Sequence, residues 1–389
     1  MSPDAARARP VARLVGEGMA VALGLGLMFA ALRLDQAWFE ARYIGTYFFP
    51  RSLFETLESA LRLVMGLLGV LLALAWRRPL GRFVEARSPA AIAAGLLRMA
   101  LAIALALGIG ELALRWRYPR AAETTLRDEP LRRTDPELGW VFAPARVGHA
   151  RVGGRLVDYA IDAAGYRVAA LDQPVDPARP SLLFAGESVM AGFGLDWRDT
   201  VPAQVAAAFR LQPVNMAGVA YADDQVYLRL RRELPRFAHP AGVVVLFSPG
   251  FLFRDFVDDR PHLEPGLVRR PAVKRWRLDS LVRFLVPYRS PAAIERRIAL
   301  VRAELQGEAA MARARDACAL VVVPRFGPET PGERRLRERI LDGSGVLYVQ
   351  VELDPAWRVP GDSHPDARGA RAIADAVVRR LRASPDCRI

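Results

Sequence analysis

Two short segments of the sequence carry side chains suited to nucleophilic catalysis. In the first, Gly186-Glu187-Ser188 follows the apolar run SLLFAG, which is typical of a buried strand. A serine at such a turn lies near the N-terminus of the next helix, where backbone N–H groups and the helix dipole can stabilise an oxyanion. A serine in this place is also a common helix N-cap, so this segment alone leaves both interpretations open.

The second segment, Asp362-Ser363-His364-Pro365, precedes the last stretch of helical periodicity. The Asp-x-His spacing lets the carboxylate reach the imidazole within one loop, where it can fix the tautomer and stabilise the imidazolium formed in proton transfer. The competing interpretation is a solvated turn histidine beside a helix-capping aspartate. Of the four histidines in the chain, only His364 combines a neighbouring carboxylate with a place at the edge where ligands are expected to bind.

From residue 181 onward, short apolar runs alternate with helical stretches, and these elements must position both segments. The candidate strands are SLLFAG, PVNMAG, GVVVLFSP, ALVVVPRF and GVLYVQV, and the helical stretches lie at about 200–210, 223–235, 290–317, 331–342 and 365–383. Ser290-Pro291 and Thr330-x-x-Glu333 have the pattern of helix starts. The alternation predicts an α/β fold with a flavodoxin-like, doubly wound parallel sheet. Such sheets bind ligands at the carboxyl ends of their strands, where Ser188 is expected.

The first third of the chain carries three apolar segments, 14–34, 59–76 and 95–114, each long enough to cross about 30 Å of hydrocarbon. A signal peptide is the alternative for the first segment, because arginines precede it. Arg98 and Glu111 lie too far apart along the third segment to pair. We therefore expect Arg98 to snorkel to one interface and Glu111 to lie near the other, with Arg115 four residues on. Three transmembrane helices are predicted.

The arginines that flank these segments set the expected topology. Three precede the first segment and four lie in the loop 77–87, which places both regions in the cytoplasm and the C-terminal domain outside. Arg115, Arg117 and Arg120 after the third segment count against this orientation, so the arginine count is nearly tied. Because long domains cross largely regardless of charge, the short loop is given more weight. The expected organisation is a membrane anchor at 1–118, an irregular or β-rich lead-in at 119–180 and an α/β domain at 181–389.

Composition excludes several classes of function. The 389 residues are 52% hydrophobic and carry a net charge of +13, and all the basic residues except Lys274 are arginine. The arginines are scattered and no nucleic-acid-binding motif is present, so nucleic-acid binding is not expected. The two cysteines, Cys318 and Cys387, exclude a disulfide scaffold and a four-cysteine zinc site. No metal or cofactor is expected, and Cys318 is interpreted as a buried small hydrophobe.

Together, the two segments resemble the SGNH/GDSL hydrolase superfamily, in its membrane-anchored bacterial envelope type. GES matches the family's GDS block with a conservative acid change, and DSHPDARGARAIADAV resembles the closing DxHPNAxG block. The resemblance covers roughly residues 125–389, including DPELGW, DYAIDAAGYR and NMAGVAYADDQ. It implies that Ser188 is the nucleophile, His364 the general base and then acid, and Asp362 the residue that orients His364. The implied reaction is attack on an ester carbonyl, formation of an acyl-enzyme, and hydrolysis or transfer.

Two blocks depart from the family pattern, and both concern the oxyanion hole. In the family, a glycine N–H after the second strand and an asparagine side chain after the third assist the serine N–H. An ungapped alignment puts Ala220 at the glycine position, with Gly218 two residues earlier, and puts Phe251 of GFLFRDF at the asparagine position. The expected oxyanion hole is therefore Ser188 with Ala220 or Gly218. One missing donor costs about 10²–10³ in rate.

The resemblance implies a membrane-anchored serine esterase or O-acyltransferase acting on acylated cell-envelope glycans. The expected location is the bacterial inner membrane, with the catalytic domain on the periplasmic side. The expected partners are an acylated glycan or other ester, membrane lipid and, for a transferase, a membrane protein that supplies the acyl group. The alternative is a catalytically degenerate SGNH-fold protein that binds or scaffolds envelope polysaccharide. The Ser-His-Asp set favours the enzyme, and Phe251 favours the scaffold. The sequence does not decide whether the reaction is hydrolysis or transfer.

Overall fold

The computed structural model describes residues 3–35, 38, 51–117, 132–285, 289–385, 387 and 389. The first part of the expected lead-in, up to residue 131, lies outside the described residues. The chain divides into two compact units. The helical unit comprises Met1–Gly45, Phe49–Tyr118 and Trp276–Arg289, and the α/β unit comprises Thr46–Phe48, Pro119–Arg275 and Ser290–Ile389.

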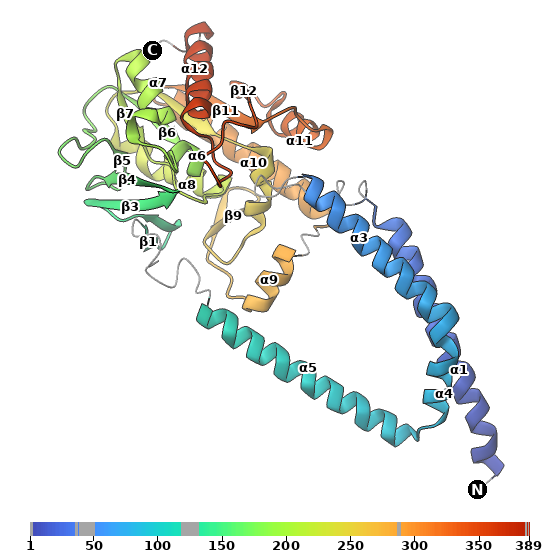
Figure 1. The fold of residues 1–389 in the computed structure, drawn as a ribbon. Helices are drawn as coiled ribbons and strands as arrows, with labels where there is room; N and C mark the ends of the chain where they lie inside the picture. The colour runs from blue at the N-terminus through green and yellow to red at the C-terminus, as the bar shows by residue number, and fades with distance from the viewer. Residues whose placement is uncertain are drawn as a thin grey trace. The chain divides into compact units, whose positions relative to one another are not determined.

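The helical unit contains the three apolar segments expected from the sequence. Its described elements are α1 (Pro3–Arg33), α3 (Arg51–Val70), the π-helix η1 (Leu71–Trp76), α4 (Arg77–Glu85), α5 (Pro89–Arg117) and α9 (Arg277–Leu285) (Figure 1). Among the described residues, three helical stretches are long and apolar enough to cross a membrane: Pro10–Arg33, Glu55–Glu85 and Ala90–Arg117. α1 runs along α3 and η1, where a Cβ at Gly24 would lie 2.5 Å from the carbonyl oxygen of Gly69. Only glycine permits this close backbone contact, as at many helix interfaces in membranes.

Glu111 near the end of α5 has the expected partner and a second one. Its Oε1 accepts a hydrogen bond from Arg115 Nε at 2.7 Å. The same carboxylate accepts the backbone N–H groups of Arg277 and Leu278 at 2.9 Å each, at the first turn of α9. Glu111 therefore satisfies N–H groups that a helix start leaves without intrahelical partners. This contact joins α9 to α5 within the helical unit, across more than 160 residues of sequence.

The α/β unit is built on a mixed sheet, eight-stranded in the described part of the chain, with the order β12-β11-β8-β6-β7-β5-β4-β3 (Figure 1). The parallel strands are β6 (Ser181–Ala185), β7 (Gln212–Asn215), β8 (Pro240–Leu246), β11 (Cys318–Phe326) and β12 (Tyr348–Leu353). Their order is that of a flavodoxin-like sheet, as the sequence predicts, and the order reverses between β6 and β8. The lead-in adds antiparallel strands β3 (Arg146–Val152), β4 (Arg155–Ile161) and β5 (Arg167–Val168).

Helices cover the sheet in two pairs. α7 (Val201–Phe209) packs on α12 (Ala367–Ala383), and α8 (Asp223–Glu233) packs on α10 (Pro291–Arg313). The crossovers β6–α7–β7 and β7–α8–β8 step in opposite directions, so right-handed connections place the two pairs on opposite faces. α11 (Pro331–Leu341) begins with the capping box predicted at Thr330 and Glu333.

The remaining described elements are short. They are α6 (Ser188–Ala191), the 3₁₀ turns η2 (Trp197–Asp199), η3 (Leu234–Arg236) and η4 (Pro249–Phe256), and the strand pairs β1 (Arg132–Asp135) with β2 (Gly139–Phe142) and β9 (His262–Glu264) with β10 (Val268–Arg270).

The interpretation of Cys318 as a simple buried hydrophobe is wrong in one respect. Cys318 is buried, as expected, but it forms a disulfide with Cys387, 69 residues along the chain. The bond ties the start of β11 to the C-terminal tail. Two cysteines this far apart give no pairing signal in a sequence, because only the fold brings their Cα atoms to 4.9 Å.

Candidate active site

The turn after β6 presents Ser188 at the carboxyl end of a central parallel strand. Gly186 precedes it with φ 153°, where a Cβ would lie 2.9 Å from the Met190 Cβ and 3.0 Å from the Leu246 Cβ. Only glycine fits this sharp strand-to-helix turn. Ser188 is the first residue of α6, and the N-cap role falls to Glu187, whose side chain accepts the N–H of Val189. Ser188 is therefore not the N-cap of α6.

The structure brings the three expected catalytic residues together. His364 Nε2 lies 2.7 Å from Ser188 Oγ, and His364 Nδ1 lies 2.5 Å from Asp362 Oδ1. Asp362 Oδ1 also accepts the backbone N–H of His364 at 2.9 Å. The hydrogen bond from His364 is the main cause that holds the pKa of Asp362 below its ordinary value. Asp362 is therefore ionised at neutral pH and able to stabilise an imidazolium.

The loop that carries His364 is held by its own backbone contacts. The carbonyl of His364 accepts the N–H of Val359 at 2.9 Å, and Arg358 forms a β-bridge with Pro365. The helix cap expected as the alternative role of an aspartate belongs to Asp366, which accepts the N–H groups of Arg368 and Gly369. Asp362 therefore does not cap α12.

The segment expected to supply the second oxyanion donor has an uncommon backbone conformation. Ala220 adopts φ 62°, in the left-handed region that favours the family's glycine. The N–H of Gly218 donates to the carbonyl of Gly186 at 3.0 Å, so it is engaged within the fold. Of the two positions weighed in the sequence, Ala220 is the better candidate. The N–H groups of Ser188 and Ala220 are then the candidate oxyanion donors.

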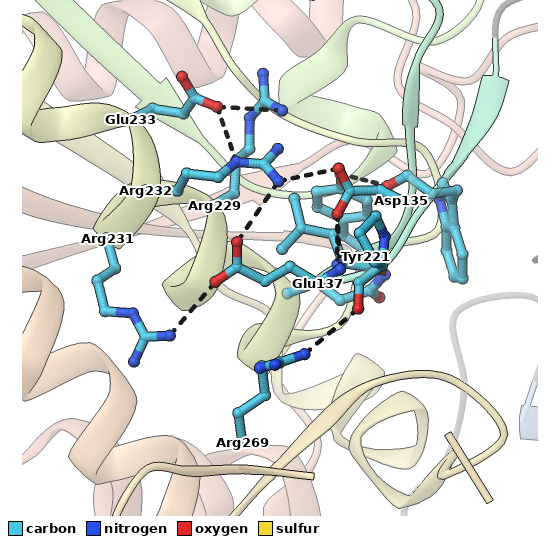
Figure 2. A network of polar contacts seen from close by, with 12 residues as sticks. Asp135, Glu137, Tyr221, Arg229, Arg231, Arg232, Glu233 and Arg269 are labelled. Atoms are coloured by element: carbon cyan, nitrogen blue, oxygen red, sulfur yellow. Dashed lines mark hydrogen bonds and ion pairs between the residues drawn. The ribbon is translucent and has the colours of Figure 1, made fainter. Parts of the chain in front are cut away.

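The segment 219–221 is supported from the lead-in. Trp140 Nε1 of β2 donates to the carbonyl of Val219 at 3.0 Å, and Tyr221 OH donates to the carbonyl of Trp140 at 2.8 Å. Ion pairs hold the paired strands β1 and β2 against α8. In this network, Arg232 of α8 lies 3.0 Å from Asp135 of β1 (Figure 2). The strands β1 and β2 therefore position the candidate oxyanion loop, which the sequence did not reveal.

Phe251, at the family's asparagine position, lies in η4 and lines the pocket next to His364. Its N–H donates to the carbonyl of Ser248 at 2.9 Å. The Arg254 guanidinium lies 3.9 Å from the centre of the Phe251 ring, and Arg254 Nη1 donates to the carbonyl of Tyr221 at 3.1 Å. Arg254 also pairs with Glu187 at 3.7 Å. This buried arginine joins the serine, Ala220 and Phe251 segments, and sequence reasoning missed it.

A pocket beside the serine has mostly apolar walls. Side chains of Val189, Leu246, Phe251, Phe326 and Leu353 line it together with Glu187 and His364. Apolar walls with a few polar groups are typical of small-molecule sites. The pocket therefore lies against Glu187 and His364, both of which contact Ser188.

Arg167, from the lead-in segment GYR, holds the backbone after the serine. Its guanidinium donates to the carbonyls of Ala191 at 2.8 Å, Gly192 at 2.6 Å and Leu195 at 2.6 Å. Burial lowers the pKa of Arg167 to about 10, which leaves it charged at neutral pH. It therefore fixes the end of α6 by charge-assisted hydrogen bonds.

A group of buried carboxyls comes from η4, α8 and α10. Asp255 Oδ1 accepts the N–H of Asp223 at 3.1 Å. Burial raises the pKa of Asp223, with the neighbouring Asp255 as a further cause, and burial raises the pKa of Asp255 to about 6. Burial also raises the pKa of Glu304 and Glu308 on α10. In the part of the chain that the structure describes, no group of three or more His, Cys, Asp or Glu side chains is arranged to hold a metal ion.

Comparison with known proteins gives similarity in structure only. No family profile and no curated protein sequence matches the chain. A lipolytic protein of the G-D-S-L family from Desulfitobacterium hafniense is 12% identical, with a TM-score of 0.34, over 51% of this chain and 98% of its own. An acetyl xylan esterase from Butyrivibrio proteoclasticus is 14% identical, with a TM-score of 0.32, over 54% and 65%.

A salicylyl-acyltransferase from a tetracycline biosynthetic pathway is 17% identical, with a TM-score of 0.30, over 53% of this chain and 55% of its own. At these identities the similarity is one of fold, and none of these proteins' activities is carried over to the chain.

Proposed function

We propose that this protein is a serine esterase or O-acyltransferase that works through Ser188, His364 and Asp362. The proposal rests on one observation, the continuous hydrogen-bonded chain from Ser188 Oγ through His364 to Asp362. A serine, a base and a residue that orients the base are the parts that activate a hydroxyl for attack on an ester. The position at the carboxyl end of a central strand is where parallel sheets bind ligands.

The reaction follows from this geometry. His364 Nε2 accepts the proton of Ser188 Oγ as the oxygen attacks the ester carbonyl, and Asp362 stabilises the resulting imidazolium. The N–H groups of Ser188 and Ala220 bind the oxyanion. The imidazolium then gives its proton to the departing alcohol, which leaves an acyl group on Ser188. Water or an acceptor hydroxyl attacks this acyl-enzyme with His364 again as the base, and the acid or a new ester is released.

The proposed setting is the outer side of a bacterial cytoplasmic membrane. In the described part of the chain, three helices are long and apolar enough to cross a membrane, which supports a membrane anchor. The disulfide between Cys318 and Cys387 supports an oxidising compartment for the α/β unit, since such bonds are rare in the cytoplasm. On the outer side of the membrane, the α/β unit could bind acylated glycans of the cell envelope, and we propose these as substrates. For transfer, a membrane partner protein would supply the acyl group.

The alternative function is a catalytically inactive protein that binds or scaffolds envelope polysaccharide. Phe251 favours it, because a side-chain oxyanion donor is replaced by an aromatic ring that Arg254 holds in place. Loss of one donor slows such reactions by about 10²–10³ without abolishing them. The enzyme therefore remains the better proposal, because the serine, histidine and aspartate keep their mutual contacts.

The test is turnover of a small activated ester by the detergent-solubilised full chain. We expect Ser188→Ala and His364→Ala each to abolish turnover. Thermal unfolding should stay nearly unchanged, because neither side chain is a large part of the core. Loss of activity that accompanies unfolding in both variants would contradict the assigned roles.

A further inference from the structure

Glu187, the residue before Ser188, contacts the nucleophile itself. Its Oε2 accepts a hydrogen bond from Ser188 Oγ, and its Oε1 accepts the N–H of Val189 at 3.1 Å. His364 Nε2 lies 2.7 Å from the same Oγ. The side chain of Glu187 is buried, so water does not weaken its contact with the serine. The serine hydroxyl therefore has two neighbours that can accept its proton.

The two contacts of Ser188 Oγ need one proton more than a serine hydroxyl and a neutral histidine carry between them. A hydroxyl has a single proton to donate. With Nδ1–H bonded to Asp362, a neutral His364 has no proton on Nε2. If Ser188 donates to Glu187, the contact between Nε2 and Oγ is a hydrogen bond only when Nε2 also carries a proton. If Ser188 donates to His364, the carboxyl of Glu187 must carry that proton.

The charges around Glu187 come from three elements. Arg254 of η4 lies 3.7 Å from Oε2, and Arg325 of β11 lines the same pocket. Asp362 and His364 face the serine from the loop before α12. Asp362 favours an added proton on His364, as does an ionised Glu187 beside the serine. Arg254 opposes a positive charge nearby, but it also favours a Glu187 carboxylate to which Ser188 can donate. The arrangement that follows has an imidazolium at His364 and Ser188 donating to Glu187.

We propose that Glu187 is a second acceptor for the Ser188 hydroxyl, which keeps an extra proton on the Ser188–His364 pair in the resting site. This proposal rests on the proposed ester chemistry. His364 cannot act as a base until that proton leaves to solvent, which its 13% exposed side chain can reach. Glu187 therefore competes with His364 for the hydroxyl proton of Ser188.

Two variants separate the effect of the Glu187 charge from the effect of its side-chain length. Glu187→Gln keeps an oxygen for the N–H of Val189 and offers an amide N–H to Ser188 Oγ, so the extra proton is no longer needed. Glu187→Asp keeps the charge but is one methylene shorter, as in the family's GDS block. Glu352→Gln removes the same charge from an exposed position on β12 and is the control.

The measurement is the dependence of kcat/KM on pH for a small activated ester, with the full chain in detergent. In Glu187→Gln the rate on the acid limb should rise by up to about tenfold, because the proton that blocks His364 is no longer held there. Glu187→Asp should raise it less, and Glu352→Gln should not raise it. A folded Glu187→Gln protein with an unmoved acid limb, whatever its kcat, overturns the proposal.

A second readout does not depend on turnover. With histidine-selective ¹³C labelling, the NMR signal of His364 reports its protonation directly, and His364→Ala assigns the signal among the four histidines. The midpoint of its pH titration should fall in Glu187→Gln. If the wild type is inert and the midpoint falls, the esterase proposal fails and the role of Glu187 stands. If the midpoint does not move, the role of Glu187 fails even in an active enzyme.

Discussion

At the scale of single residues, Phe251 is where the site differs most from the family pattern it resembles. The ring lines the pocket beside His364 and lies under the Arg254 guanidinium. In the proposed mechanism, an apolar wall at this point would exclude water from the acyl-enzyme, which favours transfer to a bound hydroxyl over hydrolysis. The remaining candidate oxyanion donors are backbone N–H groups.

Restoring an amide at this position should increase hydrolysis. Phe251→Asn can recover up to about 3 kcal/mol of transition-state stabilisation if its side chain lies within about 3 Å of the oxyanion. We expect a higher kcat/KM on a small activated ester than in the wild type. The melting temperature should fall, because the cation–π contact with Arg254 is lost. Phe251→Leu, which removes the ring without adding a donor, is the matched control.

The comparison has a clear contrary result. If Phe251→Asn is well folded and no faster than Phe251→Leu, residue 251 does not lie at the oxyanion position. The third donor would then have to be sought elsewhere in η4.

At the scale of elements, each parallel strand could be predicted from the sequence, whereas the antiparallel strands could be predicted only as an irregular or β-rich lead-in. β6, β8 and β11 are buried on both faces and read as continuous apolar runs. β3 exposes most of its residues, including Arg146, so its sequence has no such run. The contacts of Arg167 and Trp140 with the site also depend on tertiary packing. The serine and histidine segments were predictable because each carries its own local signal.

The buried carboxyls of Asp223 and Asp255 should make the free energy of unfolding depend on pH. Burial raises the pKa of Asp255 to about 6, whereas in the unfolded chain it has the ordinary value near 3.9. Between these values the folded protein holds a proton that the unfolded chain releases. Its contribution to stability is therefore full below about pH 4 and is lost as the pH rises to about 6. Asp223, whose pKa is also raised by burial, contributes a loss of the same sign as the pH rises.

The measurement is the melting temperature of the full chain in detergent from pH 4 to pH 8. Asp255→Asn removes one of the paired carboxyls, so its melting temperature should fall less over this range than that of the wild type. Glu352→Gln, at an exposed position, serves as the control for a lost surface charge. Parallel curves for the wild type and Asp255→Asn would contradict a protonated carboxyl at this position.

At the scale of the whole molecule, the membrane topology decides which substrates are available. Arginine counts alone are nearly tied, and the disulfide adds an independent argument for an external α/β unit. Closure of the 69-residue loop also stabilises the fold by about 4 kcal/mol in the chain-entropy account. Its pairing could not be predicted, because it depends on where the C-terminal tail packs.

Reporter fusions test this orientation. A reporter that is active only outside the cytoplasm should be active when fused after Ile389 and inactive when fused after Arg87, in the loop between the second and third apolar helices. The reverse pattern would place the α/β unit in the cytoplasm. Envelope glycans would then be removed from the candidate substrates, while the chemistry of Ser188 would be unaffected.

The most direct test of the account is covalent labelling of the full chain by a fluorophosphonate, which reacts only with an activated serine. We expect mass spectrometry to find the label on Ser188. His364→Ala should abolish it in a protein that remains folded, because the base that activates the hydroxyl is gone. A folded wild type that stays unlabelled, or a label on Ser188 that persists in His364→Ala, would contradict the account. An unlabelled wild type would favour the polysaccharide-binding scaffold.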